Sequence, residues 1–219
     1  MYRSLRTFGV LLALCWAAKS ASALAPGLGG PKTTLVIITD RPMADSLWTV
    51  LFAELRKEAA AEARSLSALD ADPQLVKGAD VVPGQLMDNP IVVKLHGDCR
   101  PPAGLRAFPS SAPLGWVRRE EGRISSFIQV DCTHVAELIS QRVLWMSNLQ
   151  KAAAMSGAIA RVILHEWIHI AEQSDRHTRN GISKPVFGSN DLLFGFDSEM
   201  SSSEASHRTD KPSAKSEPE

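Results

Sequence analysis

Two histidines and a glutamate lie close together in the segment VILHEWIHIAEQSDRH, which ends at His177. His165 and His169 are four residues apart, so on a helix they lie one above the other and can bind one ion. Glu166 is placed about 100° further around the helix axis. A zinc ion with three protein ligands keeps a fourth position for water, and a neighbouring carboxylate can accept that water's proton. The spacing therefore predicts a zinc site in which His165 and His169 are metal ligands and Glu166 is the catalytic general base.

The residues around this motif are mostly apolar, which predicts that the motif helix is largely buried. Ionisable side chains on such a helix would cost several kcal/mol without partners, and a metal ion satisfies them together. The alternative is that both histidines form hydrogen bonds with the backbone while Glu166 forms a structural ion pair.

A third metal ligand is expected from the residues that follow the motif helix, which should end near Gln173 and Ser174. If the chain turns back there, it brings His177 over the metal, so His177 is the first candidate. Four carboxylates are the other candidates: Glu172, Asp175, Asp191 and Glu199.

The first half of the chain is predicted to contain the strands. The segment TTLVIITD indicates a buried strand that ends at Asp40, and a helix should follow from Pro42 and Asp45 to about Leu66. Residues 67–90 are polar and rich in proline and glycine, which favours loops with at most a short strand near Val81.

The strands that follow should lead directly into the motif. Residues 90–95 predict another strand, and residues 116–117 and 124–130 predict the two arms of a hairpin. Helices are then expected from His134 and from about Leu149 to Gln173. This order predicts a single α+β domain with a mixed β-sheet, a long early helix and a buried C-terminal motif helix.

Both ends of the sequence predict segments outside this domain. Arg3 and Arg6 precede a short apolar stretch and then small residues up to Ala23, the pattern of a secretory signal over residues 1–23. Residues 198–219 are rich in serine and almost free of apolar residues, so we expect a disordered tail. The metal-binding domain is then predicted to span residues 24–197, with a secreted or periplasmic location.

The charge and hydropathy of the chain limit its partners. The sequence has 24 basic and 24 acidic residues, and removal of the predicted signal leaves a net charge of −3. There is no basic stripe with interleaved aromatic residues, so nucleic acid is not expected as a partner. After the signal no stretch is long and apolar enough to span a bilayer, so no integral membrane segment is expected.

Two cysteines remain after the predicted signal, Cys99 and Cys132. An even pair in an exported protein predicts a disulfide bond, and the alternative is two buried free thiols. Each cysteine follows an apolar run and an aspartate, so the bond would close the ends of neighbouring strands.

The HExxH motif formed by residues 165–169, on a buried helix that follows a mostly β half, resembles the zincin superfamily of zinc metallopeptidases. The later histidine makes the chain most similar to the metzincin branch, whose pattern is HExxHxxGxxH followed by a methionine turn. Glu172 occupies the glycine position, His177 comes eight residues after His169 instead of six, and Met200 is the only downstream methionine.

This resemblance implies a polypeptide substrate, bound as an added strand along residues 91–95 or along the hairpin near residues 124–130. The only tyrosine, Tyr2, belongs to the predicted signal. Stabilisation of an oxyanion would therefore depend on the zinc ion with His96, His134 or Arg179.

The sequence favours an exported zinc metallopeptidase that uses metal-activated water and Glu166. Two alternatives remain open. One is a zinc hydrolase that acts on amide or ester bonds outside proteins, and the other is a binding module in which zinc has only a structural role.

Overall fold

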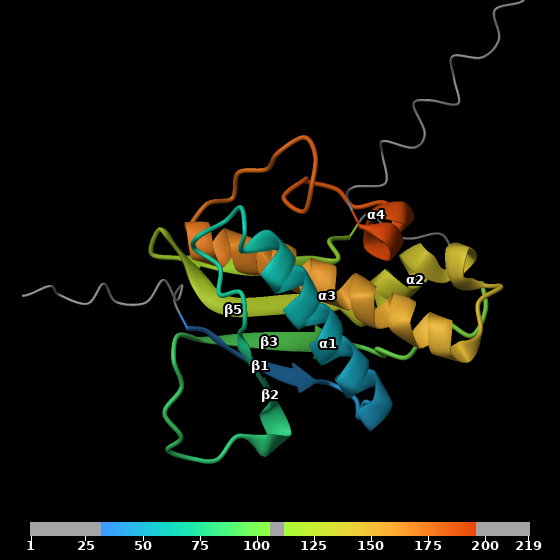
Figure 1. Cartoon of the computed structure of the whole chain (residues 1–219), viewed down its shortest axis with the longest axis horizontal. Helices are drawn as coiled ribbons and strands as arrows, with labels where there is room; N and C mark the ends of the chain where they lie inside the picture. Colours follow the sequence, from blue (N-terminus) through green and yellow to red (C-terminus); the bar gives the residue numbers. More distant parts are fainter. Residues whose placement is uncertain (1–31, 106–111, 196–219) are drawn as a thin grey trace, which may run out of the picture.

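The structure of the protein is a computed structural model that describes residues 32–105 and 112–195 (Figure 1). The predicted signal of residues 1–23, the predicted tail of residues 198–219, Glu199 and Met200 lie outside the described residues. The described part contains a mixed sheet and several helices, which confirms the prediction of an α+β domain.

Five strands form one sheet in the order β2-β1-β3-β5-β4. Strands β2, β1, β3 and β5 pair in parallel, whereas β4 is antiparallel to β5. In the part of the chain that the structure describes, β4 has a strand on one side only. The strands are β1 (Thr34–Thr39), β2 (Gln74–Lys77), β3 (Pro90–His96), β4 (Gly115–Glu120) and β5 (Arg123–Asp131).

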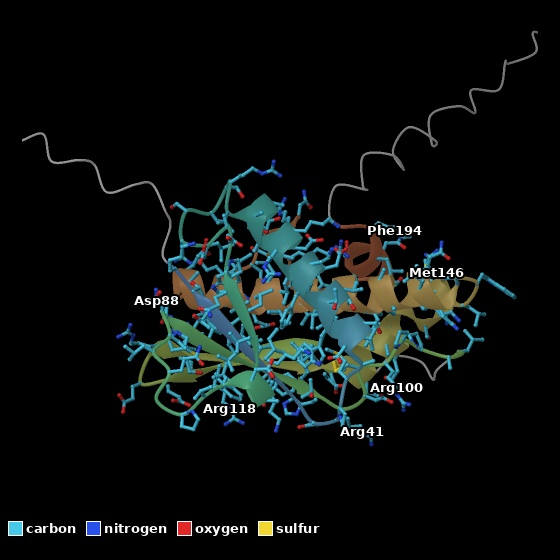
Figure 2. All side chains as sticks on the ribbon, turned by 60° about the horizontal axis from the view of Figure 1, so that its bottom comes forward. Arg41, Asp88, Arg100, Arg118, Met146 and Phe194 are labelled. Atoms are coloured by element: carbon cyan, nitrogen blue, oxygen red, sulfur yellow. A yellow bond between two sulfur atoms is a disulfide. The ribbon has the colours of Figure 1, made fainter. Side chains whose placement is uncertain are left out.

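The two long helices, α1 (Asp45–Glu62) and α3 (Asn148–Glu172), pack together on one face of the sheet (Figure 1). The view in Figure 2, turned by 60°, shows both on the same side of the strands. An ion pair of 2.7 Å between Glu58 of α1 and Arg161 of α3 joins them where both side chains are mostly buried. The shorter helices are η1 (Gly78–Asp80), α2 (Cys132–Val143) and α4 (Ser189–Phe194).

Helix α3 is the buried motif helix, as predicted. Every residue from Met155 to Ile170 is buried, because the sheet, α1, α2 and α4 all contact the helix. Ser147 and Gln150 cap its first turn reciprocally. At its other end Gln173 adopts a left-handed conformation, which stops the helix where the sequence predicts.

The Gln173 side chain forms hydrogen bonds that join this end of α3 to the sheet. Its amide oxygen accepts from the backbone N–H of Ile124 at 2.9 Å, and its amide nitrogen donates to the carbonyl oxygen of Ile124 at 3.1 Å. The motif helix is therefore held at a fixed position relative to β5.

Two predictions about the first half are wrong in detail. The short strand expected near Val81 lies earlier, at β2, and Val81 follows the 3₁₀ helix η1. Directly after β2, the backbone at Gly78 approaches β1 closely, since a Cβ atom there would lie 2.2 Å from Ile38 Cγ2. Helix α1 ends at Glu62, before the expected Leu66, although Leu66 still packs against the core.

Cys99 and Cys132 form a disulfide with an S–S distance of 2.08 Å. Cys132 begins α2 directly after β5, and Cys99 follows β3, so the bond joins the ends of two neighbouring parallel strands. It also restrains the first turn of α2.

None of the described helices is both long and apolar enough to cross a membrane.

We predict that replacing both cysteines, as Cys99→Ser with Cys132→Ser, lowers the free energy of unfolding by about 3–4 kcal/mol. The reason is that the bond closes a loop with a sequence separation of 33, which restricts the unfolded chain. Urea unfolding of the oxidised protein and of the double variant would measure the difference. Equal unfolding midpoints would contradict a stabilising bond.

Candidate metal centre

Three histidines converge at the C-terminal end of α3. The nitrogen atoms that His165, His169 and His177 can offer to a metal all lie within 4.8 Å of one another. His165 and His169 are buried in α3, whereas His177 is exposed on the loop that follows. The ring centroid of His177 lies 5.4 Å from that of His165 and 4.9 Å from that of His169.

The protonation of the two buried histidines follows from their backbone partners. Nδ1 of His165 lies 2.7 Å from the carbonyl oxygen of Ile182, and Nδ1 of His169 lies 2.7 Å from that of Ser174. A carbonyl oxygen only accepts, so each Nδ1 carries the proton, and in the neutral ring Nε2 keeps a lone pair. The two Nε2 atoms then face each other at 3.1 Å with no proton between them.

Two such lone pairs at this distance repel each other, and a shared cation removes the repulsion. Tetrahedral zinc with Zn–N bonds of 2.0–2.1 Å separates its nitrogen ligands by roughly 3.4 Å. The observed 3.1 Å is close to that value, and His177 supplies a third nitrogen nearby. The spacing of the two buried imidazoles is therefore close to that of zinc ligands, and the three histidines together could hold a metal ion.

The loop after α3 both brings His177 to the site and orients the buried rings. Ser174, which accepts from His169, begins the loop, and Ile182, which accepts from His165, ends it. A 2.9 Å hydrogen bond from the Thr178 N–H to the carbonyl oxygen of Ser183, the residue after Ile182, closes the loop. Carbonyl partners of this kind fix the tautomer of histidine ligands in metal sites.

Burial shifts the pKa values of two of these histidines in the same direction. It lowers the pKa of His165 to about 4, although the hydrogen bond to Ile182 acts in the opposite sense. Burial and the nearby His169 lower the pKa of His177, and Asp175 partly offsets this. Both rings are therefore neutral at neutral pH, which is the form that binds a metal.

Glu166 is 6 % exposed and carries no hydrogen bond or ion pair within the described residues. Burial raises the pKa of its carboxyl group to about 7. The alternative to a metal site predicted that both histidines bond to the backbone and that Glu166 forms a structural ion pair. The histidines do form these hydrogen bonds, but Glu166 forms no ion pair within the described residues.

Two of the other candidate ligands that the structure describes have different partners, whereas Glu172 is exposed at the end of α3 and is not part of the metal-binding group. Asp191 forms an ion pair with Lys184 at 2.5 Å and accepts from the Gly188 N–H at 2.6 Å. Asp175 lies 3.5 Å from Arg119. Within the described residues the group that could hold a metal contains the three histidines and no carboxylate.

The edge strand β4 lies directly beside Glu166. A Cβ atom at Gly115 would lie 2.6 Å from Val162 Cγ1 and 3.1 Å from Glu166 Cγ, so only glycine permits this approach. The prediction that substrate adds as a strand along residues 91–95 is wrong, because β3 is already paired with β1 on one side and with β5 on the other. Strand β5 is also paired on both sides, so within the predicted hairpin only the other arm, β4, lies at an edge of the sheet; β2 forms the opposite edge.

The three residues considered for oxyanion stabilisation differ in position. His96 lies at the end of β3, where it contacts Asp40 at 3.2 Å and Gln129 at 3.1 Å and stacks on Trp116. His134 lines a cavity together with His165. Arg179 is exposed on the loop after α3.

Sequence reasoning missed the carbonyl partners Ser174 and Ile182 and the role of Gly115. Every residue has a backbone carbonyl group, so no sequence signal distinguishes Ser174 and Ile182 as partners of the histidine rings. The signal for Gly115 was a glycine immediately before a predicted strand.

Comparisons with protein-family models, with curated proteins and with solved structures found no match for this chain. The interpretation of the site therefore depends on its own residues and their geometry.

We predict that Gly115→Ala lowers the free energy of unfolding by about 1–3 kcal/mol, because the added methyl group overlaps Val162 and separates β4 from α3. Thermal unfolding measures the effect. Gly104→Ala is the matched control, since a Cβ atom there meets nothing within 4 Å. Equal losses in both variants would contradict the close approach.

We also predict that Glu166→Gln stabilises the metal-free protein at high pH. The Glu166 carboxyl group has a pKa of about 7 in the folded state and 4.5 in the unfolded state. Well below pH 4.5 it is protonated in both states and does not change the free energy of unfolding. As the pH rises from 4.5 to 7, its ionisation favours the unfolded state and lowers the free energy of unfolding. The neutral amide avoids that cost, so the variant should gain about 3 kcal/mol at pH 8 and under about 1 kcal/mol at pH 5.

Urea unfolding in the presence of a chelator at these two pH values measures the gain. A gain that does not change with pH would show that the Glu166 carboxylate is not desolvated in the folded protein.

Proposed function

We propose that this chain is an exported zinc-dependent hydrolase, and more specifically a metallopeptidase. The observation that carries the proposal is the 3.1 Å distance between the Nε2 atoms of His165 and His169, whose Nδ1 atoms face carbonyl oxygens, with His177 beside them. Zinc sites with three protein ligands are typically catalytic, because one position remains for a reactant.

A zinc ion bound there supplies Lewis acidity, which lowers the pKa of water and polarises a carbonyl group. Glu166 is the carboxylate next in sequence to a ligand and has no competing partner among the described residues. We assign it as the general base that takes a proton from the attacking water. The same carboxyl group then gives the proton to the amide nitrogen as the C–N bond breaks, so one water molecule is consumed for each bond.

The position of β4 supports a peptide as the substrate. Within the described residues one side of this strand is unpaired, and that side can form backbone hydrogen bonds with an extended peptide, as in other complexes that add a strand to a sheet. Gly115 brings the strand against Glu166. A peptide bound along β4 would therefore present a backbone carbonyl group near the general base.

The non-catalytic alternative receives less support. A zinc ion with only a structural role is usually closed in by four protein ligands, for example with the addition of Asp175 or Asp191. These two carboxylates instead pair with Arg119 and Lys184.

Membership of the zincin superfamily and export are further parts of the proposal. The first rests on the spacing of His165, Glu166 and His169, with His177 as third ligand. The second rests on the signal pattern of residues 1–23, and the disulfide between Cys99 and Cys132 is compatible with an oxidising compartment.

The test compares metal content with hydrolysis of a mixed peptide library. Glu166→Gln should keep one zinc ion per chain and lose at least about 100-fold in kcat/KM, because only proton transfer is removed. His165→Ala should lose both the metal and the activity. Metal analysis and cleavage of the library followed by mass spectrometry provide the two measurements.

Glu54→Gln on α1 is the control, since it makes the same chemical change at an exposed ion pair with Lys57. Full activity of Glu166→Gln would overturn the assigned base. Hydrolysis of simple esters or amides without cleavage of any peptide would favour the non-peptide hydrolase, and a zinc-loaded protein without any hydrolysis would favour the binding module.

A further inference from the structure

A cavity of about 440 Å³ lies directly beside His165. It is bounded by the start of β4, by α2, by α3 and by the loop that precedes α4. Most of its walls are apolar, and Phe187 also packs edge-on against the His165 ring at 5.0 Å. Among its lining residues are Leu114, Leu138, Val162, Val186 and Phe187.

His134 is the histidine in this cavity that does not belong to the metal group. It lies in the first turn of α2, where its backbone N–H donates to the Asp131 side chain at 3.0 Å. Its side chain is 5 % exposed, and Nδ1 is enclosed without any hydrogen-bond partner in the described part of the chain. The ring is thus a buried polar group beside the metal centre whose hydrogen-bonding capacity is not used.

The enclosed Nδ1 indicates which nitrogen carries the proton. Buried N–H groups without a partner are rarer in proteins than acceptors that lack one, so the proton belongs on Nε2. His134 then offers an N–H donor to the cavity and needs an acceptor there.

The charges that face the cavity are already compensated. Lys184 pairs with Asp191 at 2.5 Å, and both side chains are largely buried. His165 directs its Nδ1 proton to Ile182. A carboxylate that entered the cavity would lose its hydration without gaining an unpaired cation, whereas a neutral carbonyl oxygen loses less.

We infer that this cavity selects a glutamine side chain next to the scissile bond, and that His134 is the residue that determines this specificity. The inference rests on the proposed peptidase function and deepens it. The aliphatic part of glutamine fits the apolar walls, and its amide oxygen accepts the Nε2 proton of His134. Methionine has similar length without the amide oxygen, and glutamate adds a charge.

The test measures kcat/KM for peptides that carry glutamine, methionine or glutamate at each of the two positions that flank the cleaved bond. The wild type should prefer glutamine over methionine by about fivefold at one of these positions, the ratio expected of one neutral hydrogen bond. His134→Leu should remove the preference. His134→Gln should keep it, because the new amide nitrogen lies close to the former Nε2 position.

Leu138→Val is the control, since it changes the same cavity without changing its polar groups and should alter all peptides alike. Thermal unfolding verifies that each variant folds. A preference for glutamine that survives in His134→Leu, or a wild type that prefers methionine or glutamate, would overturn the inference.

A second measurement separates this inference from the proposed function. In the Glu166→Gln protein, long-range ¹H–¹⁵N spectra should show the His134 proton on Nε2, and a glutamine peptide should shift that resonance more than its methionine counterpart. A proton on Nδ1, or equal shifts with both peptides, would overturn the role of His134. A wild type that cleaves no peptide but shows the glutamine-specific shift would contradict only the peptidase function.

Discussion

Two hydrogen bonds, from Nδ1 of His165 and of His169 to backbone carbonyl oxygens, determine the chemistry of this site. They place one proton on each ring and leave two unprotonated nitrogens face to face at 3.1 Å. This arrangement is unfavourable without a shared cation and favourable with one. The carbonyl groups belong to Ser174 and Ile182, so the loop that carries His177 also orients the rings of His165 and His169. The centre therefore depends on how that loop closes against α3.

Burial is the second constraint, and it acts on the two kinds of ionisable group in opposite directions. Desolvation disfavours the charged form, so it lowers the pKa of His165 to about 4 and raises that of Glu166 to about 7. The edge strand β4 contributes to this environment because Gly115 allows it to lie against Glu166. The same contact places β4, which has a strand on one side only within residues 32–105 and 112–195, next to Glu166. The close approach of β4 to Glu166 therefore depends on one glycine.

Much of the fold follows from local patterns. The β-branched runs at β1 and β3, the hairpin of β4 and β5, and the end of α3 at Gln173 all lie close to where the sequence predicts them. Strand β2 was harder to predict because only four residues form it and only one of them is buried. Which strands lie at the two edges of the sheet was not predictable, because pairing order depends on contacts between segments far apart in the chain. The sequence therefore did not show that residues 91–95 and 124–130, the two segments predicted to bind substrate, lie in strands that are paired on both sides.

The sequence by itself determined that two histidines and a glutamate share one helix with the spacing of a metal motif, because the helical repeat places residues four apart on one face. It also indicated His177 as the first candidate to join them. Only the tertiary structure decided which carbonyl groups orient the rings, that Asp175 and Asp191 pair with cations elsewhere, and that His134 shares a cavity with His165. Those contacts join residues of different elements, and their distances are set by packing, which no local spacing encodes.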